Sequence, residues 1–70
     1  MNKPSALLAL INIIQETVHE AGPRGIPEGH LYAALMTIPN FRVDHLNMIL
    51  DVLEKAGKVT RSNYVVREVV

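Results

Sequence analysis

The spacing of apolar residues changes once along the chain, at Gly57, and this change limits the possible folds more than any other feature. Before Gly57, apolar residues recur every three or four positions, which is the repeat of one face of an α-helix. After Gly57, apolar and polar residues alternate over short runs, which is typical of β-strands. The sequence therefore predicts an α+β fold in which three helices precede a C-terminal two-stranded β-hairpin.

The first predicted helix covers residues 4–21. Pro4 suits its first turn, where a backbone N–H has no partner inside the helix. Gly22 and Pro23 end it, because glycine favours the position after a helix and proline cannot continue one. The residues that form its apolar face are Leu7, Leu10, Ile11, Ile14 and Val18.

Two further helices are predicted before the change at Gly57. Ile26 precedes the second helix, and we expect it to enter the core as part of an extended segment of one or two residues. The second helix begins at residue 27 or 28 and ends at residue 36. The third begins at residue 41 or 42 and ends at residue 56, with Asn40 as its N-cap and Gly57 directly after it. Its predicted core residues are Leu46, Ile49, Leu50 and Leu53.

The remaining segment predicts two strands, residues 58–61 and 64–69. The polar pair Ser62 and Asn63 separates them, which favours a tight hairpin turn. We expect the second strand to lie at the edge of the sheet, where its apolar residues would invite pairing with another chain.

Length and composition place the chain among small single-domain proteins. Its 70 residues form one domain, residues 1–70, with seven basic and seven acidic side chains. Cysteine is absent, so neither a disulfide nor a thiolate metal ligand is expected, and a cytoplasmic location fits this composition. The apolar run at residues 6–14 is too short to span a bilayer, and no membrane association is expected.

No pattern in the sequence indicates an enzyme, a cofactor or a metal. The three histidines, His19, His30 and His45, fall on three different predicted helices, and no pair has the spacing of ligands on one helix. The glycines at 22, 25 and 29 lie between two helices, whereas a phosphate-binding loop follows a strand. We therefore expect a binding module with no catalytic, cofactor-binding or metal-binding residues.

The order of the predicted elements resembles the winged helix-turn-helix family. The resemblance covers residues 5–69, and residues 31–35 are similar to the second helix of that family. In the family pattern, apolar residues of the third helix are followed by a glycine and then by a valine at fixed spacing. The matching residues are Leu46, Leu50, Leu53, Gly57 and Val59.

This resemblance implies binding of double-stranded DNA and a role in transcriptional regulation, with the third helix in the major groove and the hairpin as a wing. We expect the affinity to be weak, because Asp44 and Asp51 would face the phosphates and the net charge is zero. The positions that match DNA contacts are Arg42, His45, Asn47, Met48, Lys58, Arg61, Asn63 and Arg67.

The alternative is a protein-interaction module, such as a homodimeric accessory protein, without DNA contact. The two functions require different surfaces. DNA binding requires the basic residues of the C-terminal half to share one face, whereas protein binding requires an exposed apolar patch of at least a few hundred Å². The candidate interface residues for the alternative are Leu8, Ile13, Tyr64, Val65 and Val69.

Overall fold

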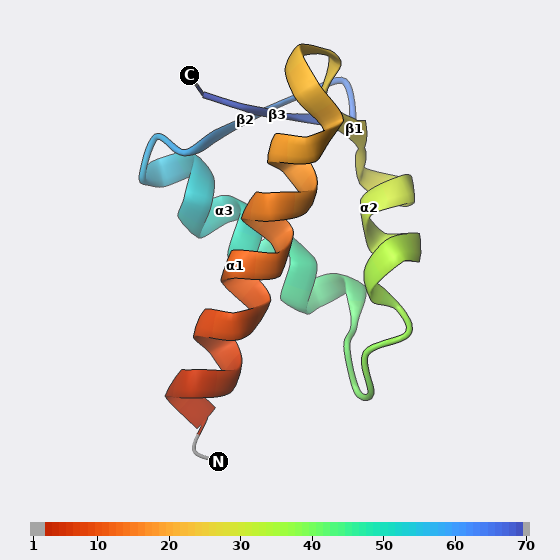
Figure 1. Cartoon of the computed structure of the whole chain (residues 1–70), viewed down its shortest axis with the longest axis vertical. Helices are drawn as coiled ribbons and strands as arrows, with labels where there is room; N and C mark the ends of the chain where they lie inside the picture. Colours follow the sequence, from red (N-terminus) through yellow and green to blue (C-terminus); the bar gives the residue numbers. More distant parts are fainter. Residues whose placement is uncertain (1–2, 70) are drawn as a thin grey trace.

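The computed structural model describes residues 3–69 and the side chains of residues 7–69. Three helices and a three-stranded antiparallel sheet form this part of the chain, so the α+β class is confirmed (Figure 1). Along the chain the elements are α1 (Lys3–Ala21), the 3₁₀ turn η1 (Gly22–Arg24), β1 (Ile26–Pro27), α2 (Glu28–Leu35), α3 (Val43–Lys55), β2 (Val59–Ser62) and β3 (Val65–Glu68).

One cluster of aliphatic side chains and a phenylalanine joins the helices to the sheet. The predicted core stripe of α3 is confirmed, because all four of its residues are buried. Among the described side chains of α1, those of residues 7–21, only Ile14 and Val18 are buried. The buried core residues are Ile14, Val18, Leu31, Leu35, Phe41, Leu46, Ile49, Leu50, Leu53, Val59 and Val66.

The sheet has the order β1-β3-β2, so the last strand lies in its centre. The hairpin of β2 and β3 was predicted, and so was the short extended segment at Ile26. The expectation that the last strand is an edge is wrong, because β1 pairs with it through Ile26–Val66 and Pro27–Val65. Sequence spacing cannot show this pairing, since the partners lie far apart along the chain.

The hairpin turn lies one residue later than predicted. Ser62 belongs to β2 and pairs with Val65. The two turn residues are Asn63 and Tyr64, which have φ angles of 52° and 62°. Left-handed conformations at both central positions define a type I′ turn, whose twist matches that of the two strands.

The ends of α3 differ in how well the sequence predicts them. Gly57 has a φ of 75°, and its N–H donates to the carbonyl of Glu54, while the N–H of Lys58 donates to the carbonyl of Leu53. This pattern is a Schellman motif, so the predicted role of Gly57 is confirmed. Asn40 is not the N-cap. Asn40 instead lies, with a φ of 64°, in a turn that the N–H of buried Phe41 closes by donating to the carbonyl of Ile38, so the helix begins only at Val43, with Arg42 as N-cap.

Candidate interaction surfaces

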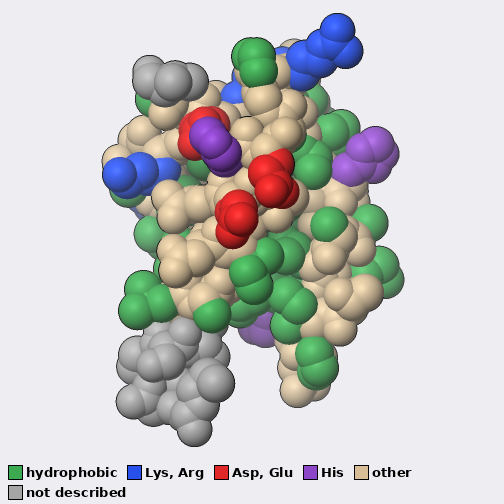
Figure 2. Space-filling view, viewed as in Figure 1, with side chains coloured by type: hydrophobic (Ala, Val, Ile, Leu, Met, Phe, Trp, Pro, Cys, Tyr) green, Lys and Arg blue, Asp and Glu red, His purple; other side chains and the backbone are tan. Residues whose placement is uncertain are grey.

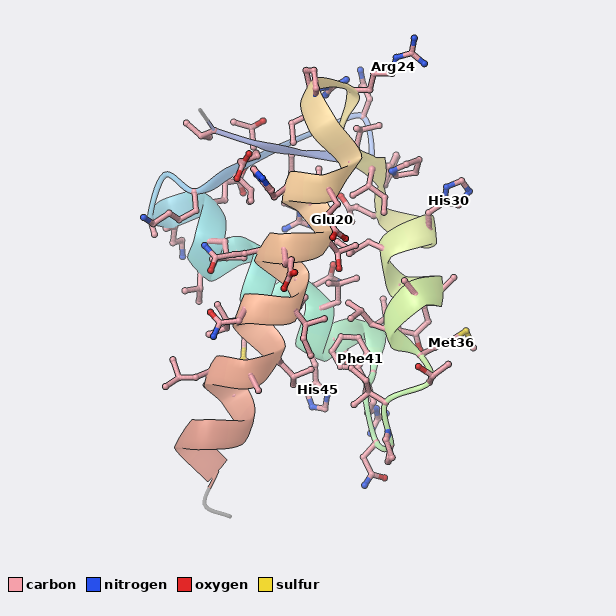
Figure 3. The ribbon with its side chains drawn as sticks, viewed as in Figure 1. Glu20, Arg24, His30, Met36, Phe41 and His45 are labelled. Carbon is pink, nitrogen blue, oxygen red and sulfur yellow. The ribbon has the colours of Figure 1, made fainter. Side chains whose placement is uncertain are left out.

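The start of α3 is organised around Phe41. Its ring lies 6.1 Å from that of Tyr32 and 6.1 Å from that of His45, measured between centroids. Figure 3 shows Phe41 and His45 beside each other, to the right of the lower half of α1. The backbone N–H of Arg42 points to Nδ1 of His45 at 3.3 Å. His45, a predicted DNA contact, therefore also helps to fix the first turn of the helix.

Arg61 joins three elements. From β2, its guanidinium donates to both carboxylate oxygens of Glu28 at the start of α2, at 3.4 and 3.3 Å. It also donates to Oδ1 of Asn47 on α3, at 3.4 Å. The side chains of Arg61 and Glu28 are only 24% and 21% exposed. Two predicted DNA contacts, Arg61 and Asn47, are thus brought together, but they form a hydrogen bond with each other.

Glu28 is the residue of this cluster that the sequence does not single out. It lies 33 positions before Arg61, and no local spacing connects the two. Its placement follows from the antiparallel pairing of β1 with β3, since the N–H of Glu28 donates to the carbonyl of Tyr64 at 2.7 Å. The start of α2 is therefore held against the hairpin, where Arg61 reaches the carboxylate.

The exposed side of α3 is acidic and apolar rather than basic. Asp44, Asp51 and Glu54 are its carboxylates, and Lys55 is 3.1 Å from Asp51 in an ion pair. The apolar residues exposed on this helix are Val43, Met48 and Val52. Of these, Met48 was a predicted DNA contact. A helix with this surface offers phosphates little attraction.

The predicted basic residues of the hairpin do not share a face. Arg61 is opposite Val66 on the face of the sheet that covers the core, while Arg67 is opposite Thr60 on the other face. Lys58 precedes β2 and Asn63 lies in the turn. In Figure 2, the blue Lys and Arg side chains, which include Arg24 outside the hairpin, lie apart at the edges of the visible face. The condition for electrostatic binding of DNA is therefore not met by the hairpin.

The N-terminal half of α1 exposes apolar side chains. Leu7 lies on the same side of the helix as buried Ile14 but is 43% exposed, because the core ends before it. Leu8 is 61% and Ile13 is 44% exposed. Figure 1 shows this half of α1 extending past the other elements. We call residues 7–13 the α1 projection.

The other predicted interface residues lie elsewhere. Tyr64 is 81% exposed in the hairpin turn, and Val65 is half-buried at the start of β3. Val69 follows β3 and lines a cavity of about 270 Å³ with Gln15 and Val18 of α1. The structure therefore separates Leu8 and Ile13 from Tyr64, and the predicted residues do not form one patch.

His19 connects the end of α1 to the end of β3. Its Nδ1 lies 2.9 and 3.0 Å from the two carboxylate oxygens of Glu68. The hydrogen bond to Glu68, reinforced by the charge of that carboxylate, raises the pKa of His19 above its ordinary value of 6.5. The position of His19 in the last turn of α1 also suits a positive charge.

The structure shows neither a metal-binding cluster nor a membrane-spanning helix in the part of the chain that it describes. Within those residues, no three histidine, aspartate or glutamate side chains come together in a way that would hold a metal ion. Figure 3 shows His30 pointing outward from α2, away from His45. Among residues 3–69, no helix combines the length and apolar character needed to cross a membrane.

Comparison with known proteins gives no relative. No protein-family model matches the sequence, and no curated protein or solved structure shows significant similarity to the chain.

Proposed function

We propose that this chain is a protein-interaction module built on a winged-helix-like frame, and that it binds another protein chain through the α1 projection. The observation that supports this proposal most is the exposure of Leu7, Leu8 and Ile13 on a helix that carries no charged residue between positions 4 and 15. Exposed apolar surface of this kind is typical of protein interfaces.

The surface of α3 supports the same proposal. A helix that reads DNA presents donors to base edges and cations to phosphates. Here Arg61 donates to both Asn47 and Glu28, and the exposed side of α3 carries carboxylates, Met48 and Val52. These side chains favour a protein partner over a nucleic acid.

Double-stranded DNA is the second candidate partner, and the arrangement of the elements favours it. A three-helix unit followed by a hairpin, with a third strand between the first two helices, is compatible with a winged-helix domain. In that arrangement Arg42, Lys58 and Arg67 would contact phosphates, and a regulatory role would follow. A fold alone does not determine function, so this candidate needs its own measurement.

A photo-crosslinking experiment in cells that express the protein tests the leading proposal. A photoreactive amino acid replaces Leu8 in one variant and Arg24 in the control, because Arg24 is exposed at the opposite end of α1 (Figure 3). We expect covalent protein adducts from position 8 and none from position 24. The same adducts from both positions, or none from position 8, would contradict the proposal.

A fluorescence-anisotropy titration with labelled duplex DNA tests the second candidate. Binding through phosphates weakens steeply as the salt concentration rises, because counterions are released from the DNA. Micromolar affinity at low salt with this dependence would favour the DNA-binding module. Absence of binding at low salt leaves the protein-interaction module.

A further inference from the structure

The α1 projection is apolar on nearly all sides. Successive residues of an α-helix advance by 100°, so the seven residues of the projection cover the whole circumference. Six of them are apolar, and Asn12 is the polar exception. A helix that is apolar all round belongs in a protein interior, yet the core of this chain covers one side of it only.

We infer that a second copy of this chain covers the projection, with α1 of one copy packed antiparallel against α1 of the other. This inference rests on the proposed function and names its partner. A two-fold axis places the same surface on both sides of an interface, so a charged patch would meet its own charge. Residues 4–15 carry no charge, and two copies can therefore meet there without repulsion.

The charges beyond the projection favour the antiparallel arrangement. Glu16 and Glu20 are exposed on the C-terminal half of α1. In a parallel pair, each of these carboxylates would approach its own counterpart. In an antiparallel pair that crosses near Leu10, Glu16 instead approaches the first turn of α1 in the second copy. The N-terminus of a helix is its positive end, so a carboxylate is stabilised there.

The size of the chain gives a reason for such a pair. Domains of this length bury a smaller fraction of their surface than larger domains do, and association is one way in which they gain stability without disulfides or metals. The chain has no cysteine, and its buried core does not extend to Leu7. Pairing through α1 would extend the core along the helix.

Light scattering on the purified protein tests the pair with two matched variants. Leu8→Lys introduces a charge into the projection at a side chain that is 61% exposed, and Met36→Lys introduces one outside the projection at a side chain that is 59% exposed. Met36 points outward from α2 on the other side of the molecule (Figure 3). Both positions are exposed, so we expect both variants to fold, which circular dichroism would verify.

We expect twice the mass of one chain for the natural protein and for Met36→Lys, and a dimer dissociation constant at least about tenfold higher for Leu8→Lys. A monomer mass for the natural protein at high micromolar concentration would overturn the inference. If position 8 still crosslinked to a different protein in cells, the proposed function would stand without the second copy.

The distance between two spin labels tests the antiparallel arrangement. Because the chain has no cysteine, Glu20→Cys supplies one exposed labelling site for each copy. An antiparallel pair that crosses near Leu10 places these two sites about 30 Å apart, from a rise of about 1.5 Å per residue. A parallel pair would place them about 10 Å apart, the usual separation of packed helices, and that result would overturn the arrangement.

Discussion

Gly25 occupies a backbone position that another residue can take only with strain. Its φ is +76° and its ψ is −172°, a region that is almost restricted to glycine. A Cβ atom there would lie 2.5 Å from the carbonyl oxygen of Val66 and 2.6 Å from Cγ of Arg67. We expect Gly25→Ala to lower the free energy of unfolding by about 3 kcal/mol, measured by urea denaturation.

Gly29→Ala is the matched control for this prediction. Gly29 lies within α2, and a Cβ atom there would meet no heavy atom within 4 Å. Alanine is the better helix former, so this variant should be more stable by about 0.5–1 kcal/mol. Equal destabilisation by the two substitutions would show that the close approach of Gly25 to β3 is not what matters.

Tyr64 is the converse case of Gly25. It is a large residue in a backbone conformation that favours glycine. Its φ is 62° at the second position of the type I′ turn, and its side chain is almost fully exposed. Asn-Gly is the preferred pair for this turn. We expect Tyr64→Gly to raise the free energy of unfolding by about 1 kcal/mol. An unchanged or lower stability in thermal denaturation would mean that the tyrosine ring stabilises the hairpin.

Among the elements, α1 and β3 are linked by the pair of His19 and Glu68. The folded protein binds a proton at His19 more tightly than the unfolded chain, because the pKa of His19 is raised. The stability from this pair is therefore fully present below about pH 6.5 and is lost as the pH rises through the folded-state pKa. Glu68→Gln removes the cause of the shift.

We expect the natural protein to have a higher free energy of unfolding than Glu68→Gln, and we expect this difference to be larger at about pH 5.5 than at about pH 8.5. Urea denaturation of both proteins at the two pH values measures this difference. Glu54→Gln, on the exposed side of α3, serves as the control. Its free energy of unfolding should differ from that of the natural protein by the same amount at both pH values. A difference for Glu68→Gln that does not change with pH would contradict the role of His19.

Arg61 links β2, α2 and α3, so its removal should affect folding before it affects any ligand. Arg61→Ala leaves the carboxylate of Glu28 without its partner in a half-buried position. We expect a loss of about 1–2 kcal/mol in the free energy of unfolding. Lys58→Ala, at an exposed cation before β2, should have little effect. Equal stability of the two variants would show that the Glu28 contact contributes nothing.

Sequence reasoning predicted the elements that depend on local patterns. The core face of α3 follows from apolar periodicity, and its end at Gly57 follows from the left-handed preference of glycine. The pairing of β1 with β3 and the contact of Glu28 with Arg61 join distant segments, and no local pattern encodes them. The turn position was missed because Tyr64 is an unusual residue for a left-handed conformation.

At the scale of the whole molecule, the candidate surfaces were predictable only in part. The excess of apolar residues on α1 can be read from the sequence, and the structure leaves Leu7, Leu8 and Ile13 exposed. The distribution of the hairpin cations could not be read, because it depends on strand register. That register puts Arg61 and Arg67 on opposite faces of the sheet.

Association through α1 should couple folding to protein concentration. When two folded chains form a pair and unfolded chains do not, mass action stabilises the folded state as concentration rises. For a chain of this length we expect Tm to rise by about 5 °C for each tenfold increase in concentration. Differential scanning calorimetry over two decades of concentration measures this slope.

The two lysine variants make this measurement specific to α1. Met36→Lys should keep the concentration dependence of Tm, because its side chain lies outside the projection. Leu8→Lys should lose it, because two lysines would approach each other at the centre of the pair while the single chain still folds. A slope that is the same in all three proteins would place the contact elsewhere, and no slope in any of them would show that the chain folds alone.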